Sequence, residues 1–184
     1  MKLYIKQKVF SWRDRFSVKD EFENDRYFVE GEITLSHKKL HIYNASGAKV
    51  AFVRQAATML KPRFLIEMYG HVVCEIVKEL TFFQQSYRLQ GLPWHLHGDF
   101  LAHEYSLVEN NWQIMQLSKK WFSWGASYEM NIAVPQNELI CLCIALAVEC
   151  VLAQQRKQHR NQQQQLNMQQ QLNQQSAQQN FHHF

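Results

Sequence analysis

One carboxylate stands alone within the longest apolar segment of the chain. Residues 139–153 read LICLCIALAVECVLA, and Glu149 is the only charged residue among them. A buried carboxylate must be hydrogen-bonded, paired or protonated, because an unpaired charge in an apolar interior is prohibitively costly. Glu149 is therefore a candidate ligand contact or lipid-headgroup site. The alternative is a structural bond that ties the last turns of a helix to its surroundings.

Basic residues occur in four short sets: Lys38-Lys39 with His41, Lys61 with Arg63, Lys119-Lys120, and Arg156-Lys157 with Arg160. If two or three sets converge on one rim, they can hold an anionic headgroup at about 1 kcal/mol per basic residue. If they scatter, they are solvated surface charges. The predicted ligand-binding residues are Lys38, Lys39, Lys61, Arg63, Lys119, Lys120 and Glu149.

Imidazole and carboxylate side chains gather between residues 95 and 104. His95 and His97 are two apart on an expected strand and so share a face, with Asp99, His103 and Glu104 nearby. These are side-chain types that bind transition metals. The alternative is a polar, outward-facing strand. Because the sequence places no third ligand, we expect neither a metal nor another cofactor.

Motifs of the common enzyme classes are missing from the sequence. It contains no glycine-rich phosphate loop, no nucleophile elbow, no metalloprotease helix and no Cys/His pair at a recognisable spacing. We therefore expect a protein that is not an enzyme.

The charge and the cysteine content limit which binding partners and which cellular compartment are expected. Residues 1–153 carry 17 Lys/Arg and 16 Asp/Glu, and this near neutrality argues against nucleic-acid binding. Lys2, Lys6 and Lys8 interrupt the first apolar residues, so no secretory signal is expected. Three of the four cysteines lie in the apolar segment, which implies no disulfide framework. We expect a cytoplasmic monomer that can associate peripherally with a membrane surface.

The apolar segment also predicts the fold. A helix that is apolar all round must be buried on every side. The preceding sequence offers strands near 3–10, 15–20, 26–33, 39–43, 49–56, 63–69, 72–80, 86–90, 94–98, 103–108, 112–119 and 127–133, joined by Asn-, Gly- and Pro-rich turns. Residues 1–153 are thus expected to form a twelve-stranded antiparallel barrel enclosing a helix at about 137–153. A membrane span is the alternative, but a bilayer needs about 20 apolar residues.

The composition changes sharply after residue 153. Fourteen of the 31 residues from 154 to 184 are glutamine. Such a low-complexity tail cannot bury enough apolar surface to fold alone, so we expect disorder or a fraying helix.

Several segments in this order resemble the LURP-one-related family, whose members have a Tubby C-terminal-like barrel around a hydrophobic C-terminal helix. They are VFSW (9–12), FSVKDE (16–21), LKPRF (60–64), LTFF (80–83), GDFL (98–101), HEY (103–105) and KKWFSW (119–124), and Glu149 also has a counterpart. The resemblance covers residues 1–153 and leaves the tail outside.

The resemblance implies function less directly than fold. The wider superfamily includes Tubby proteins, which bind phosphoinositides, and phospholipid scramblases with a calcium-associated acidic segment. The corresponding residues 128–132 hold a single carboxylate, whereas calcium sites collect several oxygen ligands. We therefore expect a barrel that binds an anionic phospholipid or other small ligand at a membrane surface. The alternatives are an interaction scaffold that contacts a protein through residues 154–184, and a scramblase-like membrane protein.

Overall fold

The computed structural model describes residues 1–6, 15–33, 38–56, 62–79, 86–122 and 125–181. Twelve strands form one antiparallel sheet in the order β8-β7-β6-β5-β4-β3-β2-β1-β12-β11-β10-β9. The two outermost strands, β8 and β9, lie next to each other and nearly close the barrel. The strands are β1 (Lys2–Lys6), β2 (Phe16–Asp20), β3 (Asp25–Ile33), β4 (Lys38–Asn44), β5 (Lys49–Gln55), β6 (Arg63–Met68), β7 (His71–Glu79), β8 (Ser86–Gln90), β9 (His95–Asp99), β10 (Glu104–Glu109), β11 (Trp112–Phe122) and β12 (Gly125–Ile132).

Alternating side chains give the strands one buried face. In β4, Leu40 and Ile42 are buried, and Ile42 lies opposite the buried Val29 of β3. Inward apolar residues at every second position fix the register, because a slip of one residue would turn them to solvent. The predicted twelve-stranded antiparallel barrel is confirmed.

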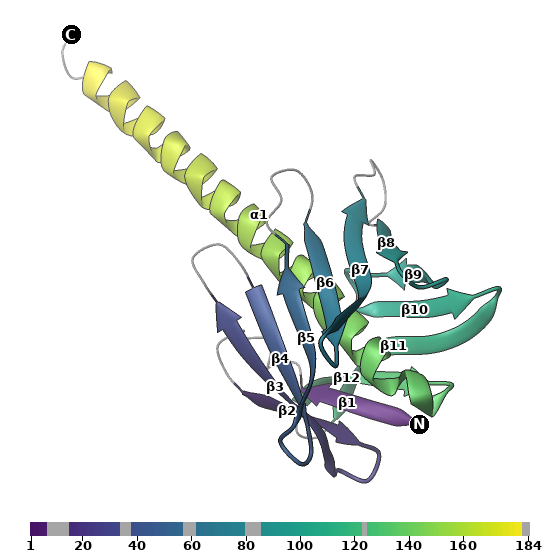
Figure 1. Ribbon diagram of the computed structural model, residues 1–184. Coiled ribbons are helices and arrows are strands. Elements are labelled where there is room, and N and C mark those ends of the chain that lie inside the picture. Colours follow the sequence, from purple (N-terminus) through teal and green to yellow (C-terminus); the bar gives the residue numbers. More distant parts are fainter. Residues whose placement is uncertain (7–14, 34–37, 57–61, 80–85, 123–124, 182–184) are drawn as a thin grey trace. The chain divides into compact units, whose positions relative to one another are not determined.

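The interior of the barrel is filled by the first part of helix α1 (Glu138–Phe181), which follows the short 3₁₀ helix η2 (Pro135–Asn137) (Figure 1). Every residue from 138 to 150 is buried. This confirms the prediction that the apolar segment is a buried helix. Helix α1 is long and apolar enough to cross a membrane. However, 83% of its most apolar stretch is buried inside the structure, as in the core helix of a soluble protein.

At each end of the barrel, a basic side chain from a strand forms a hydrogen bond with the helix. At the first, Arg26 of β3 binds the Glu138 carboxylate through two hydrogen bonds of 3.1 and 2.9 Å. This end also carries the turns at 21–24, 69–70 and 110–111, and we call it the Phe22 end. At the other, Lys38 Nζ donates to the Cys150 carbonyl at 3.1 Å, and we call it the Lys38 end. The first thirteen residues of α1 thus run from one end to the other, about 20 Å.

The chain divides into two compact units, residues 1–150 and 151–184. In the second unit the helix continues to Phe181, and its side chains from 156 to 174 are exposed. Leu166, Met168 and Leu172 are more than half exposed there.

Candidate functional site

Three lysines occupy inward-facing positions at the Lys38 end. In β4 the buried positions are Leu40 and Ile42, so Lys38 shares their face whereas Lys39 points outward. In β7 the inward positions are those of Cys74, Ile76 and then Lys78. In β11 the buried Leu117 is followed on the same face by Lys119. The interior positions of three separate strands thus change from apolar to cationic at one end of the barrel.

Lys119 is held beside an exposed aromatic ring. Its Nζ lies 5.0 Å from the centroid of the Trp121 ring, and Trp121 is 77% exposed. A cation above an indole face is attracted by the ring quadrupole. Tryptophan and lysine side by side are also the residue types that accumulate where proteins meet the headgroup region of a bilayer.

The sequence pattern did not single out Lys78, because Lys78 is a single lysine outside the basic sets. It is half-buried and lies opposite the buried Tyr87 of β8. Burial lowers the pKa of Lys78. Within the described part of the chain no carboxylate lies in ion-pair range of it. An anion arriving at this end would therefore meet an ammonium that has lost hydration and has gained no counter-charge.

Glu149 lies deeper, in a cluster of buried polar side chains. Its Oε1 is 2.7 Å from His103 Nδ1, and the two side chains are 1% and 6% exposed. The rings of His103 and Tyr128 stand 5.0 Å apart. Tyr105 donates to the Ala145 carbonyl at 3.5 Å, and its pKa is raised by burial and then by the charge of Glu149. The sequence singled out both Glu149 and His103 but did not pair them.

The other predicted basic residues lie on the outer wall or outside the described residues. Lys39 pairs with Glu32 at 3.1 Å, and Arg63 pairs with Glu75. Lys120 is exposed on β11. Lys61 falls outside the described residues. The structure therefore groups Lys38 and Lys119 at one end and separates both from the outward Lys39 and Arg63.

The histidines considered as metal ligands face different environments. His95 and His97 are exposed on β9 with ring centroids 6.3 Å apart, whereas His103 is buried with Glu149. The Asp99 carboxylate accepts backbone hydrogen bonds from Leu101 and Ala102. Glu104 is exposed. Among the described residues, no three His, Cys, Asp or Glu side chains converge as metal ligands would.

Comparison with known proteins settles the family. The family described as LURP-one-related matches residues 1–150. The chain belongs to the LURP-one-related family. This confirms the resemblance noted in its sequence, and the match ends where the second compact unit begins.

Two relatives extend the comparison for this LURP-one-related chain. It is 36% identical over 152 residues to the uncharacterized protein YxjI of Bacillus subtilis (strain 168), covering 83% of this chain and 94% of that protein. It is also similar to the X-ray structure of an Arabidopsis thaliana protein, with a TM-score of 0.54 and 14% identity. That alignment covers 81% of this chain and 90% of the other. At this identity the second likeness supports the fold alone.

Proposed function

We propose that this LURP-one-related barrel is a non-enzymatic module that binds an anionic phospholipid headgroup in the cytoplasm, at the membrane surface. The observation that carries the proposal is the placement of Lys38, Lys78 and Lys119 at inward positions of one barrel end. Interior positions of a barrel are normally apolar, and a bound anion would lower the cost of placing lysine side chains on that face. A phosphate group is such an anion.

The surroundings of the lysines favour a lipid over a small free anion. Trp121 is exposed next to Lys119, and the side chain of Leu101, in the turn before β10, is 70% exposed at the same end. Apolar side chains next to basic ones suit the boundary between headgroups and acyl chains. Each lysine near an anionic surface contributes about 1 kcal/mol, so three of them support reversible, salt-sensitive attachment.

Co-sedimentation of the full chain with vesicles tests the proposal. Vesicles of phosphatidylcholine alone are compared with vesicles that also contain phosphatidylserine. We expect pelleting only with the anionic vesicles, decreasing with salt. Lys119→Glu and Lys78→Met should each weaken it, and Lys78→Met should not impair folding because it removes a partly desolvated charge.

Matched variants separate this site from the remaining basic residues. Lys39→Glu alters a lysine adjacent in sequence to Lys38 but on the outer wall, and it should leave pelleting nearly unchanged. Replacing Arg156, Lys157 and Arg160 by glutamine tests the tail. Loss of pelleting in the tail variant alone would move the lipid site out of the barrel, and no pelleting of the wild type would refute the proposal.

A second candidate function is protein interaction through the tail. It is favoured by the helix of residues 151–181, whose glutamine-rich side chains are exposed from 156 to 174 and whose apolar residues Leu166, Met168 and Leu172 face solvent. Such a helix has little stability of its own, and packing against a partner would stabilise it. A partner that is retained after residues 154–184 are deleted would count against this function.

A further inference from the structure

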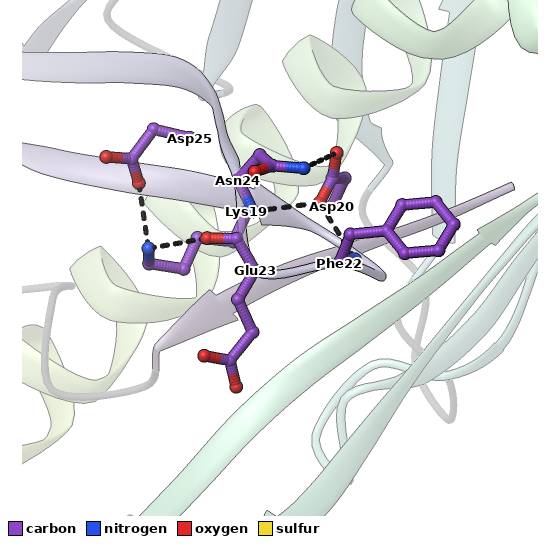
Figure 2. A network of polar contacts seen from close by, with 6 residues as sticks. All are labelled: Lys19, Asp20, Phe22, Glu23, Asn24 and Asp25. Atoms are coloured by element: carbon purple, nitrogen blue, oxygen red, sulfur yellow. Dashed lines mark hydrogen bonds and ion pairs between the residues drawn. The ribbon is translucent and has the colours of Figure 1, made fainter.

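The turn between β2 and β3, residues 20–25, is held rigid by its own polar groups (Figure 2). Asp20 Oδ1 accepts hydrogen bonds from the backbone N–H groups of Phe22 and Asn24, both at 2.9 Å. The Asn24 side chain donates to Asp20 Oδ2 at 3.2 Å. Lys19 closes the other side by binding the Glu23 carbonyl at 2.9 Å and the Asp25 carboxylate at 3.1 Å.

This rigid turn presents an apolar side chain to solvent. Phe22 is 77% exposed, and its ring extends away from the hydrogen-bonded network (Figure 2). A phenylalanine on an ordered backbone loses less entropy when it enters a pocket, because only its side chain must still be fixed. Aromatic side chains of this kind are common anchors of protein interfaces.

Acidic residues precede and follow Phe22 in the sequence. Glu21 and Glu23 are both exposed, and neither forms an ion pair with any residue that the structure describes. The two cations nearest in sequence are occupied, since Lys19 pairs with Asp25 and Arg26 with Glu138. The turn therefore carries an exposed apolar ring and two carboxylates, which an anionic membrane surface repels and a basic surface attracts.

Other exposed aromatic residues lie at the same end. Tyr69, in the turn between β6 and β7, is 71% exposed, and Trp112, at the start of β11, is 68% exposed. Tyr69 adopts a φ of 50°, which is uncommon for a bulky residue. In the sheet order the three hairpins are four strands apart, so the aromatic residues are spread around the Phe22 end. Together they extend the surface available to one partner.

We propose that the Phe22 end docks a protein partner whose apolar pocket is bordered by Lys or Arg side chains, with Phe22 as the anchor. Glu21 and Glu23 would pair with that basic border, and Tyr69 and Trp112 would add apolar contact area. This surface is distinct from the Lys38 end and requires no lipid binding.

A phage library of random 16-residue peptides, panned on the full chain, tests the recognition chemistry. Enriched peptides are then titrated by fluorescence anisotropy. We expect sequences that combine apolar and basic residues, and at least an approximately tenfold loss of affinity with Phe22→Ser. Glu23→Lys and added salt should weaken binding, and Asp20→Ala should weaken it less than Phe22→Ser. Leu101→Ser is the matched control, because it removes an exposed apolar side chain from the other end.

Each contrary outcome overturns the proposal. Enriched peptides that lack basic residues, peptides unaffected by Phe22→Ser, or no enrichment would do so. Light scattering and vesicle binding identify the alternative occupants. A wild-type dimer that becomes monomeric in Phe22→Ser would assign the surface to a second copy of this chain. Pelleting with phosphatidylcholine vesicles that is lost in Phe22→Ser would assign it to a lipid surface.

Discussion

His103, in a turn between two strands, is bonded to Glu149 inside the barrel near the Lys38 end, with 2.7 Å between Nδ1 and Oε1. The histidine adopts a left-handed φ of 58°, a conformation that the surrounding structure must hold in place. The pair joins the turn before β10 to the helix that fills the barrel. It is a buried polar contact between these two elements.

Removing one member of this pair should destabilise the fold strongly. We expect His103→Leu or Glu149→Leu to lower the free energy of unfolding by about 3–5 kcal/mol, because the remaining polar group is left buried. The double variant should lose much less than the sum of the two. Urea unfolding of the four proteins measures this coupling, and strictly additive losses would show that the two residues do not act as a pair.

Asp20 should make the free energy of unfolding depend on pH in the acidic range. Burial opposes ionisation of Asp20, but hydrogen bonds from Asn24 and Phe22 outweigh it and lower the pKa of Asp20 below its usual 3.8. Its stabilising effect is therefore fully present above pH 3.8 and is lost as the pH falls through the lower, folded-state pKa. The difference in unfolding free energy between wild type and Asp20→Ala should shrink over that range. Glu23→Gln, which removes a charge from the same turn, is the matched control variant.

Gly98 should tolerate no side chain. Its φ is 133°, and an added Cβ would lie 2.4 Å from the Glu104 carbonyl oxygen and 2.6 Å from the Tyr105 Cα. We expect Gly98→Ala to cost at least about 2 kcal/mol, since both the backbone conformation and the contact are strained. Gly47→Ala is the control, because Gly47 also has a positive φ, of 82°, but nothing within 4 Å of the added carbon. Equal losses in thermal unfolding would mean that the close approach is unimportant.

The four cysteines should resist thiol reagents while the protein is folded. All are buried, and burial raises the pKa of Cys74 and of Cys141 to about 12. A thiol of that pKa holds almost no thiolate at pH 8, and the thiolate is the reactive form. Maleimide labelling should modify none in the native state and all four in urea. Labelling of Cys141, Cys143 and Cys150 in the presence of anionic vesicles would instead indicate that the helix leaves the barrel, as the scramblase-like alternative requires.

The fold could be predicted from the sequence because two simple patterns carry it. Alternation along the strands and an apolar stretch without a polar face leave few arrangements other than a sheet around a helix. The division between Lys38 and Lys39 follows from the same alternation, once the strand is known to begin at Lys38. Lys78 was recognisable in the same way, as the third of the inward positions Cys74, Ile76 and Lys78.

The partners of the buried groups could not be predicted. Glu149 meets His103 because a turn 46 residues earlier in the chain reaches the helix. The spacing of neighbouring residues in the sequence does not predict such a long-range contact. The ion pairs of Lys39 with Glu32 and of Arg63 with Glu75 likewise depend on which strands are neighbours. Basic residues grouped by sequence were therefore separated by the sheet.

The pairing of β1 with β12 has a consequence for synthesis on the ribosome. Lys2 lies opposite Asn131, so the first of the twelve strands pairs with the last, and the barrel cannot close until that last strand has been made. Until β12 emerges, β1 has one unpaired edge, and the helix that fills the interior has not yet been made. Closure therefore requires that residues 125–150 have been synthesised, and the nascent chain passes through a stage with an exposed strand edge and an unfilled apolar interior. Ribosome-bound chains truncated before residue 125 should therefore be far more sensitive to protease than the released chain of residues 1–184.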